Sequence, residues 1–113
     1  MFHLIKEKEN KMQLKEKVKQ SYNDAVQRQW VKDNLIVDEH IESLKLTIER
    51  ALMHVSSGRG TQMHIKDIEL FGGDTKWNDQ TKMIAKNRLE KWLKSEGFTA
   101  SAASKDLFVS GWE

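Results

Sequence analysis

Four histidines are the side chains of this chain best suited to bind a metal or to move a proton near neutral pH. They are His3, His40, His54 and His64. No two of them have the H-x-x-x-H or H-E-x-x-H spacing that brings two imidazoles to one face of a helix, and the chain has no cysteine to complete a zinc site. We therefore expect no metal site, and we expect each histidine to lie on the surface or half-buried.

The other groups that carry catalysis show no arrangement of their own. The carboxylates are numerous, but no spacing places a pair of them for general acid–base catalysis. No nucleophile motif occurs, and the absence of cysteine removes thiol nucleophiles and disulfides. We predict that the chain is not an enzyme, that it has no catalytic residues and that it needs no cofactor.

The segment SSGRGT at positions 56–61 could cradle an anion with its backbone N–H groups, with Arg59 as the charge. It lacks the G-x-x-x-x-G-K-[ST] spacing of a phosphate-binding loop, and it opens no helix N-terminus. The interpretation that we favour is a turn that ends a helix and leaves Arg59 exposed, where it is a candidate contact for a partner.

Tryptophan is the residue type whose placement is least explained by the sequence. The four are Trp30, Trp77, Trp92 and Trp112. Trp92 falls on the apolar face of a predicted helix, whereas Trp30 and Trp77 fall in or beside predicted loops. Because tryptophan is enriched at binding hot spots, Trp30 and Trp77 are candidate partner contacts. The interpretation that we favour for Trp77 is an aromatic lid on the core.

The N-terminal segment is basic, and apolar residues recur in it at helical spacing from Met12 onward. The apolar positions are Leu14, Val18, Tyr22, Ala25 and Val26. Lys15 and Lys19 are candidate contacts with phosphates or with an acidic protein surface, although glutamates dilute the charge and a solvated helix face is the simpler explanation. The positions from Leu14 to Ala25 also form a seam that can pair with a second copy.

Two helices are predicted before the glycine turn. The segment NLIVDEH at 34–40 interrupts the first pattern, and Asp38 is a good N-cap for a second helix. That second helix has the most regular apolar stripe in the chain, which consists of Ile41, Leu44, Ile48, Leu52 and Val55. The residues from Ser56 to Gly58 end it.

The last third of the chain predicts a helix followed by a β-hairpin. Apolar side chains within 78–96 cover one half of a helix, and Thr75, Asn78 or Asp79 can each be its N-cap. Gly97 ends this helix, and Phe98 can contact Leu93 as in a Schellman motif. Alternation with a period of two then predicts strands in FTASAAS and LFVSGWE.

The segment 61–72 fits two structures. We prefer a strand that bends near Asp67, which gives the element order α-α-β-α-β-β and an α+β fold with helices packed on one face of a small three-stranded antiparallel sheet. The alternative is a winged helix, in which 65–72 is a short second helix, 78–96 is the recognition helix and the final hairpin is the wing. The cations of 78–96 form no single basic stripe, so nucleic acid is the less favoured partner.

One domain is expected for 113 residues, with a charged N-terminal helix at 1–33 that can protrude and a compact core at 34–113. The 38% hydrophobic and 32% charged residues are typical of a globular protein, and a net charge of +2 is too small to name a partner. No apolar run is long enough to span a membrane and no signal-peptide core is present, so we expect a cytoplasmic location. Met12 is an alternative to Met1 as the natural start.

The segments ALMHVSSGRGTQMHI and LEKWLKSEGFTASAASKDLFVSGWE resemble small accessory proteins of bacteriophages in the order helix, glycine turn, strand, helix ending in L-x-x-x-G-F/Y, and hairpin ending near a tryptophan. The matching residues are Gly58, Leu93, Gly97, Phe98, Val109 and Trp112. The resemblance implies a protein that binds and modulates a host macromolecule, and it carries over no functional residue. We hypothesise a protein-binding module that modulates or inhibits a host protein. The alternatives are a nucleic-acid-binding winged helix and a structural component of a virion or homo-oligomer.

Overall fold

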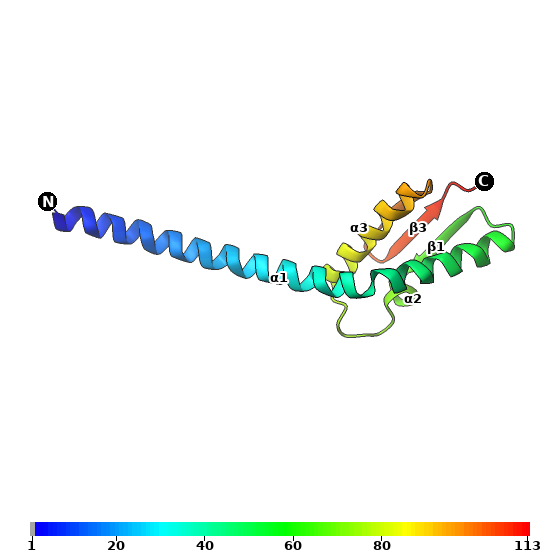
Figure 1. Cartoon of the computed structure of the whole chain (residues 1–113), viewed down its shortest axis with the longest axis horizontal. Coiled ribbons are helices and arrows are strands. Elements are labelled where there is room, and N and C mark those ends of the chain that lie inside the picture. The colour runs from blue at the N-terminus through cyan, green and yellow to red at the C-terminus, as the bar shows by residue number, and fades with distance from the viewer. Residues whose placement is uncertain (1) are drawn as a thin grey trace. The chain divides into compact units, whose positions relative to one another are not determined.

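A computed structural model describes the backbone of residues 2–113 and the side chains of residues 13–113. Met1 and Met12, the two alternative natural starts, are not among the residues whose side chains are described. The elements are α1 (Phe2–Ser57), β1 (Gln62–Lys66), α2 (Asp67–Phe71), α3 (Asp79–Ser95), β2 (Thr99–Ala102) and β3 (Asp106–Ser110) (Figure 1). The chain divides into two compact units, residues 1–32 and residues 33–113.

The three strands form one antiparallel sheet in the order β1-β3-β2, so β3 is the central strand. Val109 of β3 pairs with Met63 of β1 and with Ala100 of β2, and all three side chains are buried. Helix α3 packs on β2 and β3, and α1 adds Val37, Leu44 and Ile48 to the same core. The predicted α+β fold, with helices against a three-stranded antiparallel sheet, is therefore confirmed.

Helix α1 differs from the two helices expected over this part of the chain. The predicted break at 34–40 is wrong, because α1 continues through it to Ser57. No proline or glycine occurs between Phe2 and Ser57, so nothing in the backbone forces an interruption. The prediction that Asp38 caps a helix is wrong for the same reason, and its carboxylate instead accepts a hydrogen bond from Arg88 of α3.

The segment after the glycine turn combines the two structures that were weighed for it. A strand occupies Gln62–Lys66 as expected, but its continuation toward residue 72 is wrong because Asp67–Phe71 is helical. Leu70 and Phe71 are both buried. Two consecutive side chains of a strand point to opposite faces, so only a helical turn places both of them in one core.

The element order is thus α-β-α-α-β-β, so the predicted order α-α-β-α-β-β is wrong. The short helix at Asp67–Phe71 lies within the segment 65–72 that the winged-helix alternative made helical. The connection between α2 and α3 runs from Gly72 to Asn78, however, and these seven residues exceed the three or four of a helix-turn-helix. The chain therefore has the succession of elements of a winged helix without its compact turn.

Of the three N-caps that the sequence left open for α3 the structure has Asn78, and the predicted end at Gly97 is confirmed. At its start the Thr81 N–H donates to Asn78 Oδ1 and the Asn78 N–H donates to Thr81 Oγ1, each at 2.9 Å. At its end Gly97 has a φ of 94° and the Phe98 N–H donates to the Leu93 carbonyl at 3.0 Å, which completes the Schellman motif. These two ends position α3 along the sheet.

Removing the cap of α3 is expected to destabilise the protein measurably. Asn78→Ala deletes the side chain that accepts from the Thr81 N–H, and such a loss costs about 1 kcal/mol of unfolding free energy. Urea denaturation measures it. The matched control is Asn87→Ala on the exposed side of α3, which should be neutral or slightly stabilising. Equal effects of the two substitutions would contradict the role of Asn78.

Candidate functional site

A recognition helix presents its cations outward, and the cations of α3 do not all follow this pattern. Lys86 points inward: only 1% of its surface is exposed, its Nζ lies 3.0 Å from Asp67 Oδ1, and it donates to the Ala103 carbonyl at 2.6 Å. The contact with Asp67 Oδ1 has the distance of an ion pair but not the angles of a hydrogen bond. Lys86 therefore joins the start of α2 and the β2–β3 turn to α3.

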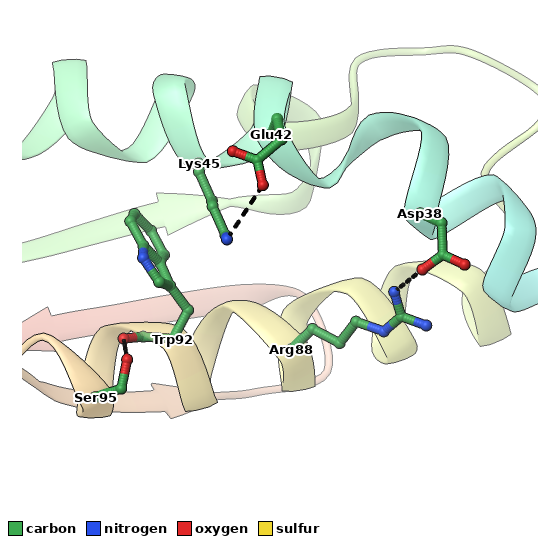
Figure 2. A network of polar contacts seen from close by, with 6 residues as sticks. All are labelled: Asp38, Glu42, Lys45, Arg88, Trp92 and Ser95. Carbon is green, nitrogen blue, oxygen red and sulfur yellow. Dashed lines mark hydrogen bonds and ion pairs between the residues drawn. The ribbon is translucent and has the colours of Figure 1, made fainter.

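Two further cations of α3 are also engaged within the molecule. Arg88 donates to the side chains of Asp38 and Asn34 on α1, and Figure 2 shows it extending from α3 to Asp38. Lys94 lies 3.7 Å from Glu90 one turn earlier. These ion pairs engage three of the five basic side chains of α3. The helix therefore has no basic outer stripe of the kind that binds phosphates.

The same α1–α3 contact contains an aromatic side chain. Lys45 of α1 lies 5.3 Å from the centre of the Trp92 ring and pairs with Glu42 at 3.3 Å (Figure 2). Trp92 is half-buried and packs against the core, as its place on the predicted apolar face required. This polar and aromatic layer aligns α1 with α3.

Trp77 is not on the surface. It is 7% exposed, and its ring lies 4.7 Å from that of Phe71 and 5.6 Å from that of His40. The aromatic lid on the core, which we favoured for Trp77, is confirmed, and the exposed position that would make it a partner contact is wrong. Burial removes Trp77 from the candidate partner contacts.

The loop before Trp77 holds one perturbed carboxyl. The pKa of Asp74 is lowered, mainly because the Lys76 backbone N–H donates to its Oδ1 at 3.1 Å, and further because the Lys76 ammonium lies 3.2 Å from its Oδ2. Because the pKa of Asp74 is lower in the folded protein, the ionised carboxylate stabilises the folded loop at a pH above the pKa of Asp74 in the unfolded chain. This stabilisation is lost as the pH falls through the pKa of Asp74 in the folded protein. The Asp74 side chain is 50% exposed, so solvent screens this contribution.

Arg59 lies in the turn that was predicted for it. It is exposed with a φ of 66°. It precedes Gly60, where an added Cβ would collide with Val55 Cγ1. Trp112 Nε1 donates to the Gly60 carbonyl at 2.9 Å and so ties the turn to the C-terminal end. The turn is a structural closure, and Arg59 remains available at its surface.

Among the residues whose side chains the structure describes, a row of exposed apolar side chains lies on the first unit of the chain. We call it the apolar row, and it consists of Leu14, Val18, Tyr22, Val26 and Trp30. Each is between 52% and 69% exposed. A spacing of four residues makes consecutive members neighbours on the helix surface. Lys15 and Lys19, the predicted contacts, are exposed beside the first members of this row.

A second apolar surface lies on the unit of residues 33–113. We call it the α1–α3 groove, with a volume of about 340 Å³, and its walls include Glu49, Leu52, Met53, Trp92, Glu96 and Phe98. Sequence reasoning missed it because residues about 40 positions apart in the chain line it together. A signal of the groove in the sequence was Met53, a large apolar residue outside the predicted stripe. The structure shows that Met53 is exposed.

The uncovered face of the sheet is a third candidate. Phe108 on the central strand stacks on His64 at 4.5 Å between ring centres, and His64 Nε2 lies 3.0 Å from Asp106 Oδ1. Phe108 also pairs across the sheet with the small residue Ser101. The cluster has the geometry of a cross-strand structural pair.

Among the residues that the structure describes, no group of three or more side chains could hold a metal ion. In the same described part of the chain, no helix combines the length and the apolar character needed to cross a bilayer. Comparison with protein-family models, with curated protein sequences and with solved structures finds no match to this chain.

Proposed function

We propose that the chain is a non-enzymatic protein-binding module that contacts its partner through the apolar row of α1. The observation that carries the proposal is the exposure of all five members of the row. Burying one large apolar side chain contributes about 1.5–3 kcal/mol, and tyrosine and tryptophan are enriched at hot spots. An exposed row of this size is typical of a helix that binds in the groove of a partner.

The charge around the row indicates the chemistry of that partner. Residues 13–32 contain five basic side chains, Lys15, Lys17, Lys19, Arg28 and Lys32, and two acidic ones, Glu16 and Asp24, for a net charge of +3. Complementary charge speeds association and selects partners. The partner that fits is a protein with an apolar groove bordered by carboxylates. In keeping with the resemblance to phage accessory proteins, we place this partner among the proteins of a bacterial host, in its cytoplasm, and the module as its modulator or inhibitor.

Charge reversal beside the row is expected to weaken binding without unfolding the protein. Lys15→Glu with Lys19→Glu should raise the Kd by about tenfold or more, because the acidic border of the partner is then repelled. The partner is first identified by affinity capture from bacterial lysate with nuclease present, then purified and titrated by calorimetry.

The matched control is Lys91→Glu, a reversal at an exposed lysine of α3, which should leave the Kd unchanged. Tyr22→Ala tests the apolar part of the same surface and should also weaken binding by roughly tenfold. An unchanged Kd for both the double reversal and Tyr22→Ala would contradict the proposed surface.

Nucleic-acid binding is the second candidate, and the winged-helix order of the elements favours it. It requires an affinity that falls steeply with salt and a captured complex that disappears on nuclease treatment. The engagement of Lys86, Arg88 and Lys94 within the molecule argues for the first candidate instead.

A further inference from the structure

The α1–α3 groove combines an apolar wall with an acidic border. Met53 is 71% exposed, and Trp92 and Phe98 are half-buried, so apolar surface is accessible there. Glu49 and Glu96 are exposed at the edges of the groove. Methionine adapts its shape to an incoming side chain, as at surfaces that bind helices.

The charge of the groove is negative even though a lysine lies near it. Lys45 sits against the Trp92 ring, but it already pairs with Glu42 at 3.3 Å. Glu49 and Glu96 therefore determine the sign of the charge that an incoming segment meets. A volume of about 340 Å³ is at the lower end for binding pockets and fits a few side chains, such as two or three from one face of a helix.

The chain itself contains the complementary surface. The first part of the apolar row, from Leu14 to Tyr22, presents large apolar side chains next to Lys15 and Lys19. We propose that the α1–α3 groove of one copy binds this part of the row of a second copy, with Lys15 and Lys19 facing Glu49 and Glu96. This inference rests on the proposed function in that the same row serves both partners, which then compete for it.

The charges favour this contact over pairing of two rows. Two copies of residues 13–32 carry a net +3 each, so placing row against row brings like charges together. Placing the row in the groove brings lysines to glutamates. Because the contact joins two different surfaces, it either closes reciprocally into a dimer or extends into an open chain.

A charge-swap experiment tests the contact. One variant reverses the row with Lys15→Glu and Lys19→Glu, and the other reverses the groove with Glu49→Lys and Glu96→Lys. All four positions are exposed, so both variants should fold, which circular dichroism checks. In sedimentation velocity the wild-type chain is expected to self-associate with concentration, and each variant alone should associate roughly tenfold more weakly.

An equimolar mixture of the two variants tests whether complementary charges restore the contact between row and groove. The acidic row of the first then faces the basic groove of the second, so the mixture should regain self-association. A wild-type chain that stays monomeric across a wide concentration range would overturn the inference, as would variants that associate like the wild type or a mixture that gains nothing.

A cross-linking experiment reports the contact directly. Since the chain has no native cysteine, Val18→Cys in one copy and Met53→Cys in another should form a mixed disulfide that Val18→Cys with Asn87→Cys does not. Equal yields would contradict the groove. The variant with Glu49→Lys and Glu96→Lys keeps the apolar row intact, so its binding of the host partner tests the proposed function separately. The host partner can bind this variant whether or not the chain self-associates.

Discussion

Lys86→Met is expected to reduce the free energy of unfolding by about 3 kcal/mol, near the lower end of the range for breaking a buried ion pair. The substitution keeps most of the side-chain volume but removes the ammonium that faces Asp67 and the Ala103 carbonyl. The Asp67 side chain is 18% exposed, so water can solvate the carboxylate in part after the ammonium is removed. The expected loss of stability therefore lies near the lower end of the range for a buried ion pair. Urea denaturation measures it.

Two variants separate the ion pair from other effects of the substitution. Lys91→Met, at an exposed position of the same helix, should change stability by no more than about 0.5 kcal/mol. Lys86→Met combined with Asp67→Asn should cost less than the sum of the two single changes, because the buried charge that lost its partner is then absent. A loss below about 1 kcal/mol for Lys86→Met would show that water already satisfies the site.

Trp77→Ala should be similarly destabilising, with a loss of about 3–5 kcal/mol, which is usual when a large buried aromatic side chain is deleted. The ring contacts Phe71 of α2 and His40 of α1, so its removal leaves a cavity where the loop 72–78 closes over the core. Thermal and urea denaturation both measure the effect. Trp77→Phe should cost less because it retains part of the contact.

The control for Trp77 is the tryptophan of the apolar row. Trp30→Ala removes a ring that is 56% exposed and should cost about 1 kcal/mol or less in stability. Its effect should appear in partner binding instead. Trp77→Ala protein that remained as stable as Trp30→Ala protein would contradict the place of Trp77 in the core, and the two substitutions together separate stability from binding.

Local signals in the sequence were sufficient for much of the fold. The ends of α3 follow from Asn78 and Gly97, whose side-chain chemistry and backbone freedom act within a few residues of the chain. The hairpin follows from alternation after Gly97, and Leu44 and Ile48 of the predicted stripe are buried in α1. The exposed row from Leu14 to Tyr22 was also visible as a helical pattern, together with Lys15 and Lys19.

Other features depended on which segments meet in space. Polar Asp38 looked like a helix start, but α1 continues because Val37 is buried and Asp38 meets Arg88 of α3. The residues after Lys66 became helical because Leu70 and Phe71 both enter the core.

By itself, therefore, the sequence determined the end of α3 at Gly97, the hairpin and the first part of the apolar row, from Leu14 to Tyr22, since each depends on interactions between residues a few positions apart. Only the tertiary structure decided that Lys86 is buried, that Trp77 closes the core and that Met53 and Trp92 share a groove. A lysine enters a core only where a distant carboxylate meets it, and a groove exists only between two packed elements. Burial and charge pairing are properties of residues brought together from far apart, and the spacing of residues along the chain does not contain them.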